Sequence, residues 1–119
     1  MIEILEQSTE RCLAVHFSGK VTGQEYQRFI DALQVRLKGG SEVNLVVKLA
    51  GFEFYGDFDA AKKDLKFGFG EYKLIRRMAL VGDQEWIGWF IRIFGAFTPT
   101  EEKHFSAGET DAAILWANA

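Results

Sequence analysis

The chain has 119 residues, which is the size of one domain that can bury a substantial core. We therefore expect residues 1–119 to form a single domain. Hydrophobic residues make up 48% and charged residues 26% of the sequence, which excludes an intrinsically disordered chain. The formal net charge of −3 argues against a dedicated nucleic-acid-binding protein, because such proteins usually carry a basic excess.

The cysteine content and the length of the apolar segments predict the compartment. Cys12 is the single cysteine and cannot form an internal disulfide, and its apolar surroundings predict a buried thiol in a reducing compartment. No signal peptide is visible after Met1. The longest apolar segment, at about a dozen residues, is shorter than the roughly 20 needed to span a bilayer. We therefore expect a cytoplasmic protein.

The first third of the chain predicts a β-hairpin followed by a helix. Residues 1–7 and 11–19 alternate apolar and polar side chains on either side of a short polar segment. Residues 22–40 then follow a helical period. Thr22 and Glu25 form a capping box at its start, and a pair of glycines ends it.

Strands and helices alternate in the middle of the chain. Residues 42–51 form a β-branched run that is typical of a buried central strand, and residues 73–82 predict a fourth strand. A second helix is predicted to begin at Asp57, a residue type that favours the N-cap position. A third helix covers residues 83–97 and is ended by Pro99.

The last elements are a short edge strand over residues 102–107 and a helix over residues 109–119, capped near Glu109 or Thr110. The full order is ββαβαβαβα. Such alternation predicts an α/β fold with a mixed, mostly parallel sheet and flanking helices.

This order resembles the STAS domain, the fold of anti-sigma-factor antagonists, over essentially the whole chain. The sequence is most similar to the divergent SpoIIAA-like group, which also places a tryptophan-bearing helix after the fourth strand. The segments that carry the resemblance are "LVVKLAGFEFYGDF", "MALVGD", "EEKHF" and "AAILWA". The resemblance implies a bacterial-type regulatory domain.

One feature of the family is missing. In the bacterial antagonists, a serine after the third strand is phosphorylated at a helix N-terminus, where free N–H groups favour negative charge. Gly56, Asp57 and Phe58 stand at that position here, and no serine or threonine lies between Ser41 and Thr98. We therefore expect no phosphorylation switch. Asp57 is either a helix cap or a fixed negative charge in place of the phosphate.

The third helix is more apolar around its circumference than one contact with a sheet requires. At about 100° per residue, its apolar side chains cover an arc of roughly 220°, whereas a helix that packs on a sheet needs little more than 100°. The side chains on this arc are Trp86, Ile87, Trp89, Phe90, Ile91, Ile93, Phe94, Ala96 and Phe97. About half of the arc is left to meet something other than the sheet.

Four alternatives account for this surplus. The neighbouring second helix and the "FGFG" segment cover it, or it is a self-association surface of a homodimer. Alternatively, the second and third helices enclose a slot for an apolar or amphipathic small ligand, or the third helix dips into a lipid surface, at the inner face of the membrane. The aromatic residues that we expect to line such a site are Phe58, Phe67, Phe69, Trp86, Trp89, Phe90, Phe94 and Phe97, with Ile93 beside them.

A local excess of positive charge lies between residues 62 and 77. Lys62, Lys66 and Arg76 are candidates for contact with an anionic headgroup; the alternative is a solvated helix face. A ligand with an apolar body and one anionic end fits both features.

Catalytic and metal-binding patterns are not found. His16 and His104 have no ligand-spaced partners, and no nucleophile, phosphate-loop or dinucleotide motif is present. The sequence therefore predicts a non-enzymatic binding domain without cofactor or metal. The alternative is a protein-interaction module that uses the same helix.

Overall fold

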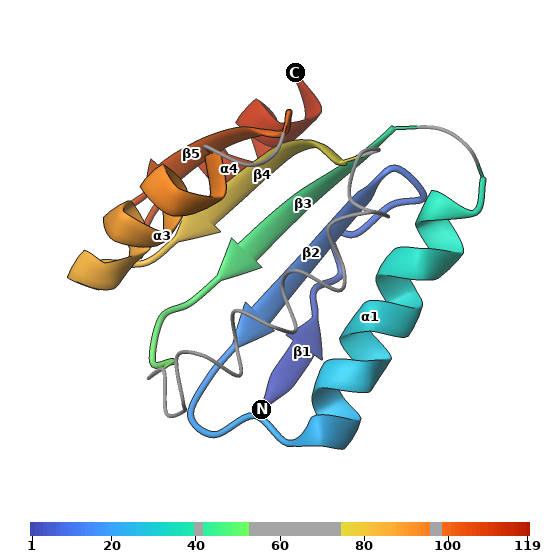
Figure 1. Cartoon of the computed structure of the whole chain (residues 1–119), viewed down its shortest axis with the longest axis horizontal. Helices are drawn as coiled ribbons and strands as arrows, with labels where there is room; N and C mark the ends of the chain where they lie inside the picture. The colour runs from blue at the N-terminus through green and yellow to red at the C-terminus, as the bar shows by residue number, and fades with distance from the viewer. Residues whose placement is uncertain (40–41, 53–74, 96–98) are drawn as a thin grey trace.

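The computed structural model describes residues 1–39, 42–52, 75–95 and 99–119. A five-stranded sheet in the order β1-β2-β3-β4-β5 forms the centre of the molecule (Figure 1). Its strands are β1 (Ile2–Ile4), β2 (Cys12–Phe17), β3 (Val43–Lys48), β4 (Ile75–Val81) and β5 (Glu101–Phe105). β1 is antiparallel to β2 and the other pairs are parallel, which confirms the predicted mixed, mostly parallel sheet with a buried central strand.

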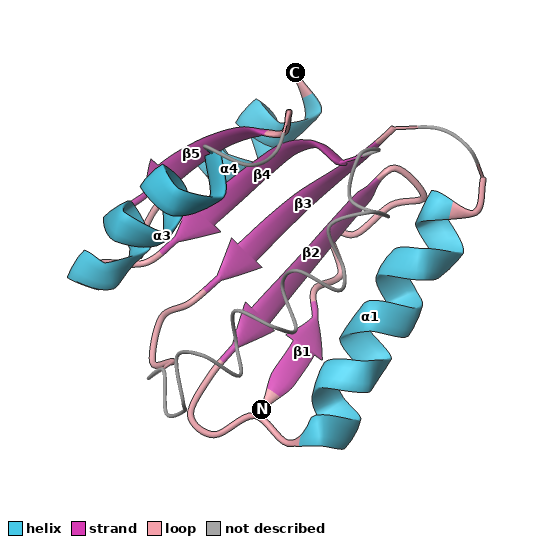
Figure 2. Cartoon of the chain, in the orientation of Figure 1, coloured by secondary structure: helices cyan, strands magenta, loops and turns pink. Residues whose placement is uncertain are grey.

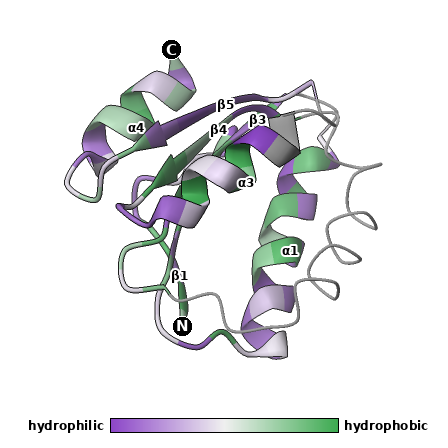
Figure 3. Ribbon diagram, turned by 60° about the vertical axis from the view of Figure 1, so that its left-hand side comes forward, coloured by the Kyte–Doolittle hydropathy of each residue, from purple (hydrophilic) through white to green (hydrophobic). Residues whose placement is uncertain are grey.

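Helices cover both faces of this sheet (Figure 2). The described helices are α1 (Gly23–Leu37), α3 (Glu85–Gly95) and α4 (Thr110–Asn118). α1 and α3 pack on one face through the apolar core cluster that contains Phe29, Leu33 and Ile87. α4 packs on the other face through Ala113 and Ala117, so the sheet lies between two helical layers (Figure 3).

The alternation of side chains along the strands builds these two layers. In β2, Leu13 and Val15 belong to the core under α1 and α3, whereas Cys12 and Ala14 belong to the core under α4. Small residues line the α4 side, where alanines of α4 meet Ala14 and Ala79, so α4 lies close to the sheet. Cys12 is fully buried there, as the sequence predicted.

The ends of α1 agree with the sequence. The Thr22 hydroxyl accepts a hydrogen bond from the Glu25 N–H at 3.1 Å, and the Glu25 carboxylate accepts one from the Thr22 N–H at 3.3 Å. This capping box satisfies N–H groups that have no partner within the helix. The Glu25 carboxylate also accepts a hydrogen bond from the Ile2 N–H at 2.6 Å, which ties α1 to β1.

The start of α4 lies where the sequence placed it, but it is built differently. Glu109 occupies the N-cap position without capping the helix through its side chain. Its carboxylate instead accepts hydrogen bonds from the Ser106 N–H at 2.9 Å and the Ser106 hydroxyl at 2.6 Å. Among the described residues the element order is ββαββαβα; the predicted second helix, with its start at Asp57, lies outside them.

A register irregularity in β4 changes where its arginines point. Val43 pairs with Ile75, but Leu45 pairs with Met78, so β4 contains one extra residue opposite Asn44. A bulge of this kind interrupts the strict alternation of side chains. As a result, Arg76 and Arg77 both reach the carboxyl end of α4.

Candidate functional site

α3 is held firmly at its first turn. The side-chain amide of Gln84 donates hydrogen bonds to the carbonyl oxygens of Leu49 at 2.6 Å and Phe52 at 2.9 Å, beyond the end of β3. Gly82 leaves the room for this contact, because a Cβ at this position would lie 2.5 Å from Gln84 Oε1 and 2.9 Å from Ile87 Cδ1. A side chain at position 82 would therefore have to displace the Gln84 amide and the end of the Ile87 side chain.

The inner face of α3 belongs to the core. Ile87 is fully buried, and Trp86, Phe90 and Ile91 are partly buried against the same apolar cluster. The Trp86 ring meets the Phe52 ring edge-on at 6.2 Å between centroids. This is the favoured geometry for neighbouring aromatic rings, and it fixes the rotation of α3 about its axis.

The ring of Phe52 continues this contact toward α1. Phe52 and Phe17 lie 5.7 Å apart, and Phe17 and Phe29 lie 5.3 Å apart, both in edge-on geometry. An aromatic row thus runs from α3 to α1 past the carboxyl ends of β2 and β3. It couples the two helices that share this face of the sheet.

The outer face of α3 carries a mixed stripe that we name the outer stripe: Glu85, Gly88, Trp89 and Arg92. Residues three and four positions apart lie on one side of a helix. Glu85 and Arg92 are exposed, and Trp89 is exposed to 44%. A Cβ added at Gly88 would meet nothing within 4 Å, so the helix surface is open at this position, which we call the notch.

Part of the apolar arc predicted for α3 is thus covered by the protein core, so fewer apolar side chains are exposed among the described residues than the helical wheel suggested. Trp86 and Phe90 pack against the core, and among the described aromatic side chains of α3 only Trp89 is exposed. The remaining predicted site residues, whole or in their side chains, lie outside the described part of the structure: Asp57, Phe58, Lys62, Lys66, Phe67, Phe69, Ile93, Phe94 and Phe97.

The structure does not bring Arg76 to the site on α3. The Arg76 guanidinium donates hydrogen bonds to Asn44 Oδ1 at 3.2 Å and to the main-chain oxygens of Ala117 at 3.2 Å and Ala119 at 2.6 Å. It lies on the α4 face of the sheet, opposite α3. Its expected grouping with Lys62 and Lys66 was based on closeness in sequence, whereas the strand and its bulge direct this side chain to the other face.

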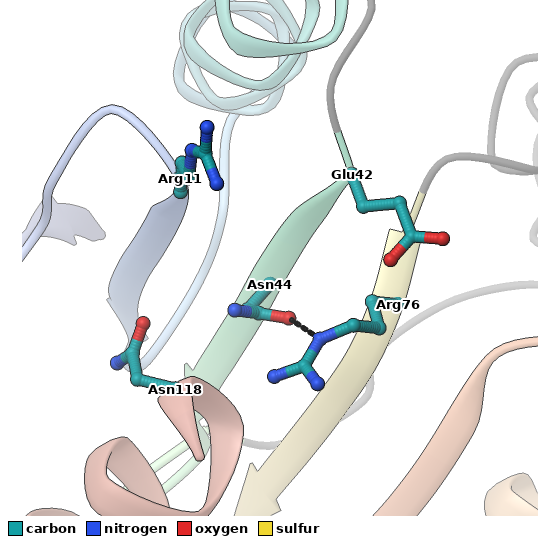
Figure 4. Close-up of a pocket in the computed structure, with 5 residues that line it drawn as sticks. All are labelled: Arg11, Glu42, Asn44, Arg76 and Asn118. Carbon is teal, nitrogen blue, oxygen red and sulfur yellow. Dashed lines mark hydrogen bonds between the residues drawn. The ribbon is translucent and has the colours of Figure 1, made fainter.

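Arg76 instead lines a polar pocket of about 440 Å³ near the amino ends of β2 and β3 (Figure 4). The other lining residues are Arg11, Glu42, Asn44 and Asn118. Figure 4 shows the Arg76 guanidinium between Asn44 and the last turn of α4. Sequence reasoning missed this pocket because its residues come from separate elements and share no local motif. Arg76 is already bound to protein acceptors, so its role here is to hold α4.

Both histidines are bound to the backbone. His16 Nε2 donates a hydrogen bond to the Ala50 carbonyl at 2.8 Å, which agrees with the structural role expected for this residue. His104 Nε2 donates one to the Gly82 carbonyl at 2.6 Å. Within the described ranges, no group of three or more His, Cys, Asp or Glu side chains is arranged to hold a metal ion, and no helix has the length and apolar character to cross a membrane.

The family follows from a comparison of the sequence with protein-family models. The model described as SpoIIAA-like matches residues 12–118, which include every described element except β1. The chain belongs to the SpoIIAA-like family. The resemblance identified from the order of elements is therefore confirmed.

A solved structure supports the same assignment for this SpoIIAA-like domain. The crystal structure of an uncharacterized protein from Shewanella loihica PV-4, of the DUF3478 family and with a SpoIIAA-like fold, is similar to it with a TM-score of 0.72 and 30% sequence identity. The similarity covers 98% of this chain and 93% of that chain. No curated protein matches the sequence. The comparisons therefore establish the family and the fold of this chain.

Proposed function

We propose that this SpoIIAA-like domain is a non-enzymatic binding module that contacts its partner through the outer stripe of α3. The observation that carries the proposal is the 44% exposure of Trp89 on a helix whose inner face is fixed in the core. Burial of one large apolar side chain contributes about 1.5–3 kcal/mol. Tryptophan and arginine are also the residues that dominate binding energies at protein interfaces.

The charges beside Trp89 favour a protein partner over a lipid surface. Glu85 lies one turn before the indole and Arg92 one turn after it, so both signs of charge border a single aromatic contact. Protein surfaces offer matching charges of both signs. An anionic membrane would be repelled by Glu85 and by the exposed Asp83.

An amphipathic small ligand or a membrane surface is the second candidate. Phe90 and Ile91, partly exposed beside Trp89, favour it because they extend the apolar contact area. One aromatic contact of this size supports only weak, reversible attachment once the cost of association, about 4 kcal/mol or more, is subtracted. This candidate places the protein at the inner membrane face.

We also propose that this domain catalyses no reaction. Backbone carbonyls occupy Nε2 of both His16 and His104, and the two residues belong to different strands, β2 and β5. Both imidazoles therefore have structural contacts with the main chain, and we expect neither to act as a general base.

Trp89→Ser tests the position of the site. The matched control is Leu115→Ser, because Leu115 is an apolar side chain exposed to 75% on α4, on the opposite face of the sheet. Three measurements compare the variants with the original protein: self-association by sedimentation, flotation with phosphatidylcholine or phosphatidylglycerol vesicles, and titration with oleate followed by NMR. We expect Trp89→Ser to lose at least tenfold in whichever binding the original protein shows, and Leu115→Ser to retain it.

The outcomes separate the candidates. Loss of self-association favours a protein partner, whereas loss of flotation or of the oleate shifts favours the amphipathic ligand. If Trp89→Ser behaves like the original protein in all three measurements, the outer stripe is not the binding surface and the proposal is wrong.

A further inference from the structure

We infer that the outer stripe of α3 is built to pair with the outer stripe of a second copy of this chain, in an antiparallel, two-fold arrangement. The inference rests on the proposed function and names the partner of that surface. It follows from the order of four residues along one face of a helix.

The order of charges is self-complementary. When two α3 helices run antiparallel about a two-fold axis between Gly88 and Trp89, Glu85 of each copy faces Arg92 of the other. Both side chains are exposed and lie at opposite ends of the stripe, two helical turns apart. In a two-fold interface each contact occurs twice, so one complementary pair becomes two ion pairs. A parallel arrangement would place Glu85 against Glu85, which is unfavourable.

The same axis places each indole against a glycine. Trp89 of one copy faces Gly88 of the other, where a Cβ would have open space around it. Glycine disfavours a helix at an interior position such as residue 88. Its presence in the middle of α3 is explained if the notch receives the ring of the second copy, which is 44% exposed in the single chain.

The helix dipoles favour this orientation. Glu85 lies in the first turn of α3 and Arg92 in the last, so each charge is favourable at its own helix end. Antiparallel helices also place the positive end of one dipole beside the negative end of the other. The charged pairs and the dipoles therefore select the same orientation.

The size of the contact predicts a weak dimer. α3 has 11 residues and is about 16 Å long, so a contact limited to this helix buries less than the roughly 1,200 Å² of a standard interface. We expect a dissociation constant on the order of 100 μM.

Charge reversal tests the pairing and its orientation. Glu85→Arg places two arginines opposite each other at both ends of the dimer, and Arg92→Glu places two glutamates there. Each variant alone should associate at least tenfold more weakly than the original protein in sedimentation equilibrium between 20 and 1,000 μM, values chosen to bracket the expected constant. A mixture of the two variants should associate again, because every charged contact between them joins an arginine to a glutamate.

A second variant tests the notch. Gly88→Gln fills the open space beside Trp89 and improves the helix propensity of α3. We expect its thermal unfolding midpoint as a monomer to equal or exceed that of the original protein while its self-association is lost. Leu115→Ser, on the other face, should associate like the original protein.

Three results would overturn the inference: a monomer throughout the concentration range, single charge reversals without effect, or no recovery in the mixture. The proposed function fails separately. If the original protein is monomeric but Trp89→Ser abolishes vesicle flotation or the oleate shifts, the α3 site stands and only the second copy is excluded. If Trp89→Ser changes none of these measurements, both proposals fail.

Discussion

Arg76 and Arg77 show how one extra residue in a strand changes the role of a side chain. Arg77 donates a hydrogen bond to the Trp116 carbonyl at 2.7 Å, lies 5.0 Å from the centre of the Trp116 ring, and pairs with Glu101 at 3.1 Å. Arg76 binds the neighbouring carbonyls of the same helix end. The two guanidiniums therefore supply positive charge where the α4 dipole is negative.

The substitution Arg76→Met should destabilise the fold. It keeps the apolar stem but leaves Asn44 Oδ1 and the Ala117 carbonyl without their charged donor, and Ala119 O keeps only the 3.4 Å hydrogen bond from Arg77. Hydrogen bonds to a charged group contribute about 1.5–3 kcal/mol, so we expect the free energy of unfolding to fall by about 2 kcal/mol in urea titration. Arg11→Met, at an exposed residue of the same pocket, should change it by less than about 0.5 kcal/mol. Equal effects would mean that Arg76 does not hold α4.

The residues that the sequence grouped into one candidate site do not all lie on the same face of the sheet. The apolar arc of α3 included Trp89, which is exposed, but a helical wheel gives directions around an axis and does not show which side the rest of the chain covers. Arg76 was grouped with Lys62 and Lys66 because they are near in sequence. The bulge that sends Arg76 to α4 has no local sequence signal, since it arises from the pairing of two strands.

At the scale of elements, the carboxylate of Glu25 connects the first helix to the first strand. It accepts hydrogen bonds from Thr22 at the start of α1 and from Ile2 in β1, and it lies 3.7 Å from the amino group of Met1. The hydrogen bond from the Ile2 N–H is the main reason that the pKa of Glu25 lies below its ordinary value.

This pKa shift predicts a pH dependence. A carboxyl group with a lower pKa in the folded than in the unfolded chain stabilises the fold above its unfolded pKa of about 4.3, and this contribution is lost as the pH falls through the folded value. We therefore expect Glu25→Gln to be less stable than the original protein at pH 7. The difference in free energy of unfolding should shrink as the pH falls below about 4.

Chemical denaturation from pH 7 to pH 2.5 measures this difference. Glu6→Gln is the control, because Glu6 is exposed in the turn between β1 and β2. A difference between Glu25→Gln and the original protein that stays constant over the whole range would exclude the carboxylate charge as its origin.

At the scale of the whole molecule, most of the fold was predictable because the deciding signals are local. The hairpin, α1 with its capping box, the central strand and the edge strand each follow from a period or a cap within a few residues. Their assembly into a mostly parallel sheet follows from the alternation of strands and helices. Side-chain contacts between distant elements, such as the polar pocket and the aromatic row, depend on that assembly and had no signal of their own.

Cys12 reports on the layer formed by α4. The thiol is fully buried between the sheet and α4, and burial raises its pKa above the ordinary value. Only the thiolate reacts with a disulfide reagent, so modification requires the α4 layer to open. We expect the native protein to react with a disulfide reagent more slowly than the unfolded chain, on the order of 1,000-fold or more.

Arg76→Met should speed this reaction by about 30-fold, because a loss of about 2 kcal/mol in the stability of the α4 layer changes an opening equilibrium by that factor. Arg11→Met should leave the rate unchanged. Rapid modification of Cys12 in the native original protein would show that α4 does not protect it.

The charged residues of β5 affect how copies of this protein meet one another. β5 is one of the two edge strands of the described sheet, and Glu101, Glu102, Lys103 and His104 occupy four of its five positions. A strand lined in this way resists backbone pairing with a strand of another molecule, the contact through which sheets extend into fibrils. We therefore expect copies at high concentration not to join through this edge of the sheet.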